Sequence, residues 1–268
     1  MSETKEVEED ALVLPLQKVK AATKSPKNLI IFSAPKVGKT ELLAGLDNNL
    51  ILDMEDGSDF VDAIKMKVKS VGDIKKVGVA IKEAGYPYDY VTIDTITALE
   101  TICVPYAEIL YARTPMGKNW FKKDPVSGKL ALESGKSQYG DILGLPNGAG
   151  YKYLRQAFTN IVEHIKTFAP RLIQLGHVKD VQLEKSGVEV SSSDLDLTGK
   201  IKRIAASQSD AIGFLYRHKD GNKNILSFKT TGEIACGARP THLSNKEIVI
   251  SEMTDKGLKT HWNSIYID

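Results

Sequence analysis

The residues best suited to chemistry in this chain form the octapeptide Ser33-Ala34-Pro35-Lys36-Val37-Gly38-Lys39-Thr40. It follows the apolar run Leu29–Phe32 and precedes the helix-forming stretch Glu41–Ala44. A strand, a tight loop, Gly-Lys-Thr and a helix in this order cradle the phosphates of a nucleotide triphosphate. The loop amides and the helix N-terminus face the phosphates, the lysine supplies a point charge, and the threonine hydroxyl reaches Mg²⁺. All eight residues are therefore candidate nucleotide ligands.

The loop departs from the usual pattern at its first position, where a serine stands in place of glycine. If Ser33 needs a positive φ, its Cβ is unfavourable there and the grip on a nucleotide is weaker. The alternative explanation for the whole octapeptide is a polar turn between a strand and a helix. The remainder of the fold has to decide between these two readings.

Three polar side chains follow later apolar segments. Asp94 closes one such segment and is a candidate for the magnesium shell, with a helix cap as the alternative. Glu55 follows the segment 49–53 at the expected carboxyl edge of a sheet, where ligands bind in open α/β folds. We interpret it as the residue that activates water, with a solvated acidic turn as the alternative. His177 follows the segment 171–176 and is a candidate phosphate sensor, with a purely structural role as the alternative.

The apolar pattern predicts the elements that must position these residues. Strands are expected at 29–32, 49–53, 89–94, 171–176 and 210–217, and helices near 39–46, 72–84, 95–112 and 150–168. Near-continuous apolar strands that alternate with helices indicate an α/β fold whose mostly parallel central sheet has helices on both faces. Beyond residue 217, short strands and turns predict an antiparallel C-terminal edge.

Composition narrows the class of protein. The chain has 268 residues, 42% of them apolar, which is enough for one large core. A net charge of +2 is too small to indicate nucleic acid by itself. Cys103 and Cys236 are far apart and outside metal-ligand spacing, which favours a reducing compartment and no zinc. The acidic N-terminus differs from a signal peptide and no apolar run approaches the ~20 residues that span a bilayer, so we expect a cytoplasmic location and no membrane contact.

With the phosphate loop and the strand ends Asp53-Met54-Glu55, Asp94 and His177 in this order, the chain resembles RecA-type ATPases. Among these it resembles the phage RecA-like ATPases of the Sak-type single-strand annealing and recombination group, whose loop matches at Pro35–Thr40 and departs at Ser33. The resemblance implies that Lys39, Glu55 and His177 are catalytic and that Thr40 and Asp94 hold Mg²⁺ beside ATP. It implies a RecA-like domain over 28–240, between an acidic tail, apolar arm and linker (1–27) and a C-terminal extension (241–268).

The same resemblance implies a DNA path lined by two segments. The first is the long loop 113–149, whose basic and aromatic residues suit single-stranded DNA because cations neutralise phosphates and aromatic rings stack on bases. A loop anchor with solvated lysines is the alternative. The second is the stretch 178–190, which reads as a β-hairpin around Lys185-Ser186-Gly187. The DNA-binding candidates are Lys118, Trp120, Phe121, Lys122 and Lys123.

RecA-like ATPases complete the active site with a cation from a neighbouring protomer, which implies a homo-oligomer. The candidates here are Lys200, Lys202, Arg203, Arg217 and Arg239, all of which a solvated basic face also explains. The apolar arm 12–16 is a candidate for addition to a neighbour's sheet.

The sequence therefore predicts a Mg²⁺-dependent, DNA-stimulated ATPase that acts on single-stranded DNA in phage recombination, in the cytoplasm of the bacterial host. A single-strand-binding protein is a candidate partner. The alternative is a non-hydrolysing, nucleotide-gated DNA-binding or adaptor protein, in which Ser33 and His177 mark lost turnover.

Overall fold

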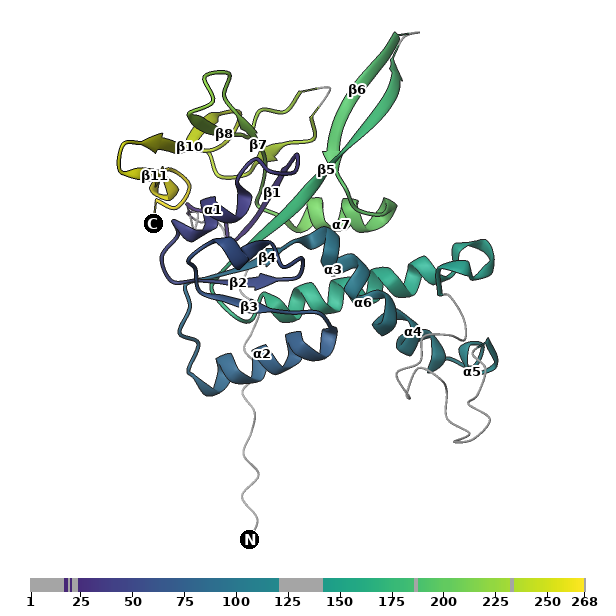
Figure 1. The fold of residues 1–268 in the computed structure, drawn as a ribbon. Coiled ribbons are helices and arrows are strands. Elements are labelled where there is room, and N and C mark those ends of the chain that lie inside the picture. Colours follow the sequence, from purple (N-terminus) through teal and green to yellow (C-terminus); the bar gives the residue numbers. More distant parts are fainter. Residues whose placement is uncertain are drawn as a thin grey trace.

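The fold is built on one sheet whose central strands are parallel. The computed structural model describes residues 17, 18, 20, 24–120, 142–185, 188–231 and 234–267, with side chains described outside 119–120 and 180–192. Within them the parallel strands lie in the order β7-β1-β5-β4-β2-β3 (Figure 1). Their bounds are β7 Ala211–Arg217, β1 Asn28–Ser33, β5 Arg171–Lys185, β4 Tyr90–Asp94, β2 Asn49–Asp53 and β3 Lys65–Lys67.

Antiparallel strands extend the sheet beyond β7. The order continues through β8, β10 and β11, while β9 pairs with β7 and β6 pairs with the far half of β5. This part includes residues 247–260, so the segment expected as a C-terminal extension adds strands to the same sheet. The bounds are β6 Val188–Leu195, β8 Lys223–Ser227, β9 Gly237–Ala238, β10 Glu247–Thr254 and β11 Gly257–Thr260.

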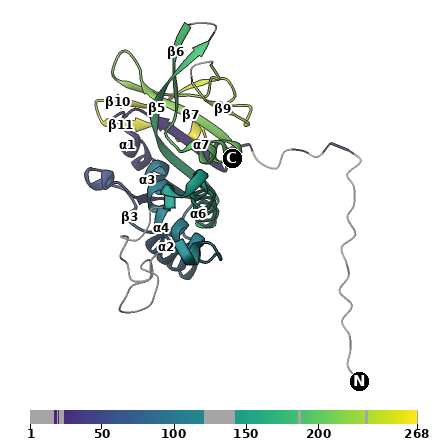
Figure 2. The ribbon, with the colours of Figure 1, turned by 90° about the vertical axis from the view of Figure 1, so that its right-hand side faces the viewer.

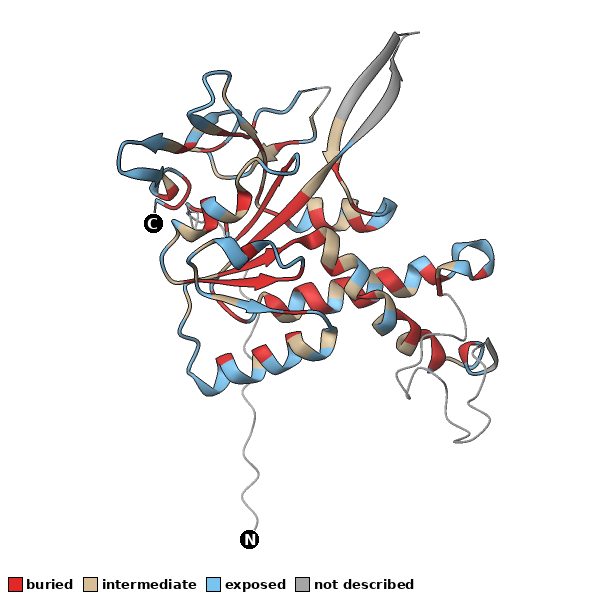
Figure 3. Cartoon of the chain, in the orientation of Figure 1, coloured by how far each residue is buried: buried red, intermediate tan, exposed pale blue. Residues whose placement is uncertain are grey.

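Helices cover both faces of the sheet. The larger core lies between one face and the helices α2, α3, α4, α6 and α7, whereas α1 and the C-terminal turn around Trp262 pack on the other face (Figures 1, 2 and 3). None of the described helices is long and apolar enough to cross a membrane. The bounds are α1 Lys39–Ala44, α2 Val71–Glu83, α3 Ile96–Ile102, α4 Val104–Ala112, α5 Gly117–Trp120, α6 Gly150–Ile165 and α7 Gly199–Gln208. Short 3₁₀ turns are η1 Gly57–Phe60, η3 Ile142–Gly144, η4 Pro146–Gly148 and η5 Trp262–Ser264.

Local chemistry explains where these elements begin and end. The hydroxyl of Ser70 accepts a hydrogen bond from the amide of Asp73 at 3.1 Å and caps α2. Gly85, with φ +73°, follows the C-cap of that helix. The expected helix 95–112 is divided into α3 and α4, because Pro105 lacks the amide that would continue the first helix.

The predicted fold class and the principal elements are confirmed. The expected strands match β1, β2, β4, β5 and β7, and the hairpin expected at 178–190 is formed by β5 and β6. Outside the long loop, one strand and one α-helix were not expected. The strand β3 has only three residues at the edge of the sheet, and α7 was read as a basic segment although Ile201 and Ala205 give it a buried face. The long loop expected at 113–149 contains α5, η3 and η4 in its described parts, and residues 121–141 lie outside the described residues.

The C-terminal end of the described chain lies beside the segment that leads into β1. The amide of Ile267 donates a hydrogen bond to the hydroxyl of Ser25 at 2.9 Å. Ser25 shortly precedes β1, so this contact lies near the amino end of the central parallel strands. The candidate site residues follow the opposite, carboxyl ends of those strands.

Candidate nucleotide-binding site

The phosphate loop joins β1 to α1 as the sequence predicted. Gly38 precedes the helix with φ +97°, a conformation that a side chain disfavours, and Lys36 also has a positive φ of 62°. The amino group of Lys39 is buried and donates to the hydroxyl of Ser33 at 2.9 Å and to the carbonyl of Ala34 at 3.3 Å. The loop therefore encloses its own cation.

Ser33 does not occupy a strained position. It is the last residue of β1, pairs with His177 of β5 and has no positive φ, so the condition under which its Cβ would weaken the grip on a nucleotide is not met. Its hydroxyl accepts from Lys39 and donates to the carbonyl of Ala34 at 2.8 Å. The serine that replaces the usual glycine thus orients the lysine through its hydroxyl.

Thr40 and Asp94 come together at the end of β4. The threonine hydroxyl donates to a carboxylate oxygen of Asp94 at 3.0 Å. Burial raises the pKa of Asp94 to about 6, with the charges of Asp53 and Glu55 adding to the rise, while the Thr40 hydrogen bond and Lys39 oppose it. A buried carboxylate beside a hydroxyl fits Mg²⁺, because hard oxygen ligands suit this ion and its charge offsets the cost of ionising the acid.

Burial lowers the pKa of Lys39, and the charges of Asp94 and Glu55 offset part of this shift.

The described part of the chain holds no group of three or more His, Cys, Asp or Glu side chains that could hold a metal by themselves. Magnesium commonly takes one or two carboxylates and completes its shell with substrate phosphates and waters. The donor set of Thr40 and Asp94 fits this mode of binding.

Glu55 is held from two sides. The hydroxyl of Thr95 donates to one carboxylate oxygen at 2.8 Å, and Nε2 of His177 lies 3.1 Å from both oxygens. Thr95 also caps α3 by accepting from the amide of Ala98 at 3.2 Å. The structure therefore brings Glu55 and His177 into direct contact, which the sequence did not reveal.

The loop after β2, which carries Glu55, is fixed at both ends. Buried Asp53 accepts from the amide of Glu55 at 3.1 Å and from the amide and hydroxyl of Ser58. Burial raises the pKa of Asp53, but these hydrogen bonds lower it more, so the carboxylate is kept charged. Alternate lysines on and after β3 also hold this loop. Lys65 donates to the carbonyls of Ser58 and Val61, Lys67 pairs with Asp59 at 2.9 Å, and Lys69 pairs with Asp56 at 2.5 Å and donates to the carbonyl of Met54 at 3.1 Å.

The phosphate loop, Glu55, Asp94 and His177 line a pocket of about 400 Å³ at the carboxyl edge of the sheet. Six of its residues had no predicted place in the pocket of their own chain: Glu41, Gly57, Phe60, Val61, Thr95 and Arg217. The side chain of Phe60 is 97% exposed. The pocket is lined by Pro35, Lys36, Gly38, Lys39, Thr40, Glu41, Glu55, Gly57, Phe60, Val61, Asp94, Thr95, His177 and Arg217.

The remaining candidates lie elsewhere. Lys202 pairs with Asp194 at 2.5 Å and Arg239 pairs with Asp210 at 3.3 Å. Lys200 lines a separate groove with Tyr151 and Arg155, and none of these three cations lines the pocket around Lys39. Of the DNA-binding candidates, Lys118 is exposed on α5 and Trp120 ends that helix. The side chain of Trp120, together with Phe121, Lys122 and Lys123, lies outside the described residues.

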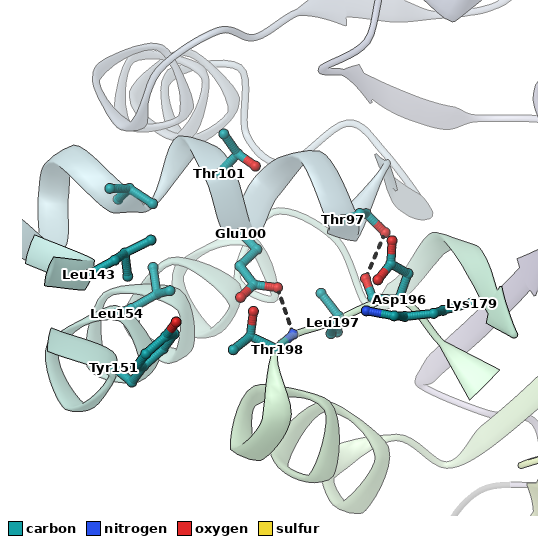
Figure 4. A pocket seen from close by; sticks show the side chains of 11 residues that line it. Thr97, Glu100, Thr101, Leu143, Tyr151, Leu154, Lys179, Asp196, Leu197 and Thr198 are labelled. Carbon is teal, nitrogen blue, oxygen red and sulfur yellow. Dashed lines mark hydrogen bonds between the residues drawn. The ribbon is translucent and has the colours of Figure 1, made fainter. Parts of the chain in front are cut away.

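A second pocket of about 280 Å³ lies at the base of the β5–β6 hairpin (Figure 4). Glu100 accepts a hydrogen bond from the amide of Thr198 at 3.0 Å, and Thr97 donates to the carbonyl of Asp196 at 3.2 Å. These contacts tie α3 to the segment between the hairpin and α7. The lining includes Lys179 beside Glu100 and Asp196, a mixed set of charges that does not mark a phosphate path.

Comparison with known proteins finds a match to the part of the chain that carries the phosphate loop. A family model described as an AAA domain matches residues 25–115, which span β1 to α4 and contain the phosphate loop, Glu55 and Asp94. Among solved structures, the crystal structure of the RadB recombinase aligns with a TM-score of 0.44 and 10% identity, over 88% of this chain and 92% of that chain. No curated protein matches.

Proposed function

We propose that this chain is a Mg²⁺-dependent ATPase that acts on single-stranded DNA in recombination. One observation carries the ATPase assignment: Lys39, the Thr40–Asp94 pair and the fixed carboxylate of Glu55 converge on one pocket at the carboxyl edge of a parallel sheet. Ligands of open α/β sheets bind at this edge. The AAA-domain match to residues 25–115 supports the same assignment.

The residues divide the reaction between them. Lys39 and the loop amides bind the phosphates, and Thr40 with Asp94 would hold Mg²⁺, which neutralises phosphate charge when bound. Glu55 orients a water and takes its proton, while the water oxygen bonds to the γ-phosphorus. The bond from that phosphorus to the bridging oxygen breaks, and ADP leaves with the electron pair. Thr95 and His177 fix the carboxylate for this role.

Two apolar residues of the pocket offer a place for the base. Phe60 and Val61 are among its lining residues, and an aromatic ring that is 97% exposed offers a face for stacking on a purine. The turn η1 that carries Phe60 is held through Ser58 by buried Asp53. The ring of Phe60 is therefore connected to the loop that carries Glu55.

The DNA partner is proposed from the resemblance and from residue chemistry. Lys118 is exposed at the start of the basic and aromatic segment that continues through Trp120. The same resemblance underlies the proposals of a homo-oligomer, of a single-strand-binding protein as partner, and of a phage protein in the host cytoplasm. Each of these stands or falls separately from the ATPase assignment.

The contact between His177 and Glu55 also favours a second candidate, a nucleotide-gated switch without turnover. Nε2 of His177 lies 3.1 Å from both carboxylate oxygens, so the carboxylate is engaged before any water is oriented. If that contact persists with nucleotide bound, ATP binds and is not hydrolysed. The second candidate keeps the same pocket and differs only in the fate of the nucleotide.

A single set of measurements separates the two candidates. Phosphate release and ATP binding are measured with and without single-stranded DNA for the wild type, Lys39→Ala, Glu55→Gln and the control Glu83→Gln on α2. For the ATPase we expect turnover to fall at least about 100-fold in Lys39→Ala and Glu55→Gln and to stay unchanged in the control. Glu55→Gln should still bind ATP. Tight binding with no turnover in the wild type would favour the switch, and no binding would refute both.

A further inference from the structure

We propose that Arg217 supplies a further cation to the pocket that contains Lys39 of its own chain, so that the phosphate site is completed without a neighbouring protomer. This inference rests on the proposed ATPase function. Arg217 was considered from the sequence only as a residue acting across a protomer boundary. The structure places it among the residues that line the pocket of its own chain, together with Lys39, Thr40 and Glu55.

The sheet register brings Arg217 to the phosphate loop. Strand β7 pairs in parallel with β1, and the last pair joins Phe214 to Phe32. From there β7 continues for three residues to Arg217, about 10 Å at the usual rise of a strand. Because β1 ends at Ser33 and turns into the phosphate loop, this overhang carries Arg217 to the loop.

The neighbouring strand keeps this overhang in place. Arg217 pairs with Asn224 of β8, and a Cβ placed on Gly38 would lie 3.7 Å from Nδ2 of Asn224. The same Nδ2 donates to the hydroxyl of Ser251 on β10 at 3.1 Å, and Ser251 is fully buried. The β7–β8 hairpin is therefore held against the phosphate loop by the strands beyond it.

Arg217 is available to bind a phosphate, as the charges of the pocket show. The pocket contains the carboxylates Glu41, Glu55 and Asp94 and the cations Lys36, Lys39 and Arg217. Arg217 is exposed and forms no ion pair with a carboxylate in the part of the chain that the structure describes. In contrast, Lys202 and Arg239 are already paired with Asp194 and Asp210.

Arginine suits the chemistry of a transferring phosphate. Its guanidinium is always charged, and its planar fork donates two parallel hydrogen bonds to phosphate oxygens. Negative charge grows on the bridging oxygen as its bond to the γ-phosphorus breaks, so a cation that reaches the bridging oxygen and the adjoining phosphate oxygens stabilises the transition state more than the ground state. We therefore assign Arg217 a role in turnover rather than in nucleotide capture.

Binding of a transition-state mimic tests this role independently of activity. Binding of ADP alone and of ADP with aluminium fluoride is measured by calorimetry for the wild type, Arg217→Ala, Arg217→Lys and the control Lys219→Ala on the same hairpin. We expect Arg217→Ala to bind ADP within about threefold of the wild type and to lose about 100-fold or more of the tightening by aluminium fluoride. Arg217→Lys should recover part of the tightening, and Lys219→Ala should match the wild type. Unchanged tightening in Arg217→Ala would overturn the inference.

A mixing experiment separates a cation from the same chain from one supplied by a neighbour. The Arg217→Ala and Glu55→Gln variants are mixed, and ATP turnover is measured over a range of protein concentrations. The molecular mass of the protein in solution is measured at the same concentrations and gives its oligomeric state. If Arg217 acts within its own chain, the mixture stays inactive, because neither chain holds a complete site. Recovery of turnover would assign the arginine to a neighbour and refute the inference. A wild type that binds no ADP would refute the proposed function instead.

Discussion

At the scale of single residues, the site is organised by side chains that hold other side chains. Ser33 holds Lys39, Thr40 holds Asp94, and Thr95 with His177 holds Glu55. Each functional group is therefore oriented before a ligand arrives, which lowers the cost of ordering it during binding. The same enclosure removes Asp94 and Lys39 from water. It raises the pKa of the Asp94 carboxyl and lowers the pKa of the Lys39 amino group, and both shifts favour the neutral form.

The raised pKa of Asp94 predicts how acid changes ligand binding. Below pH 6 the carboxyl is protonated and competes with Mg²⁺, so Mg²⁺-dependent ADP binding should weaken from pH 7.5 to pH 5. Calorimetry with and without Mg²⁺ measures this difference. Asp94→Asn should weaken Mg²⁺-dependent binding at both pH values and remove the pH dependence. An equal pH effect with and without Mg²⁺ would contradict the assignment.

The same shift has a consequence for stability. Without ligand, the folded state binds the Asp94 proton more tightly than the unfolded state, since its pKa rises from 3.8 to about 6. The contribution of this group therefore falls as pH rises through that window, by about 3 kcal/mol at 1.36 kcal/mol per pKa unit. Denaturant unfolding of the wild type and Asp94→Asn between pH 4 and pH 7 measures the difference.

At the scale of elements, short connections place the functional side chains as much as the regular strands do. The helix α6 begins at Gly150, which packs against the backbone of Ile142: a Cβ on this glycine would lie 1.8 Å from the carbonyl oxygen of Ile142. Ile142 belongs to a small cluster with Tyr111 and Ala112 of α4. Because Gly150 has no side chain, the start of α6 can pack closely on Ile142, and Ile142 in turn packs against α4.

Gly150→Ala should therefore destabilise the protein. A backbone carbonyl cannot rotate away as a side chain does, so we expect a loss of about 1–3 kcal/mol in the free energy of unfolding. The control is Gly72→Ala on α2, where the nearest atom to a new Cβ is a serine hydroxyl at 3.4 Å. That change should be neutral or stabilising by up to about 1 kcal/mol. Urea unfolding compares the two variants, and equal effects would argue against the backbone contact.

At the scale of the whole molecule, the nucleotide pocket and the segments expected to meet DNA belong to one frame. Strand β5 pairs with β1 as far as His177 and with β6 from Val178 onward, so the histidine that contacts Glu55 lies where the sheet becomes the hairpin. Likewise α5 follows α4 and is anchored by Thr114, whose hydroxyl accepts from the amide of Gly117 at 3.0 Å. Both segments are thereby connected to the core that holds the nucleotide site.

Lys118 on α5 gives the prediction for DNA. If it contacts a phosphate, Lys118→Ala should weaken binding to single strands of any sequence and reduce the slope of log affinity against log salt by about 0.7. Fluorescence anisotropy with a labelled oligonucleotide at several salt concentrations measures both quantities. The control Lys82→Ala lies in the last turn of α2. Equal slopes for both variants would remove α5 from the DNA path.

The sequence predicted those features that depend on local pattern. The strand, loop and helix around Lys39 were foreseen because apolar runs and Gly-Lys-Thr are contiguous, and Asp94 because it closes an apolar run. The contact of His177 with Glu55 depends on strand order, in which β4 separates β2 from β5. Sequence spacing does not contain that order.

Two further features were missed for related reasons. Arg217 reaches the pocket through an overhang of β7 beyond β1, which only the register reveals. Strand β3 is too short to show an apolar alternation, and its lysines gain meaning only from the carbonyl and carboxylate groups of the loop they hold.

The hydrogen bond between Ser25 and Ile267 has a practical consequence for handling the molecule. Ser25 and Ile267 lie together near the amino end of the central strands, whereas the nucleotide pocket opens at the carboxyl edge. A fluorophore or surface linker attached to a cysteine placed at position 267 therefore starts on the side away from the pocket. Protein held on a surface through this position should bind ADP with the same affinity as free protein, which makes the position suitable for single-molecule recording.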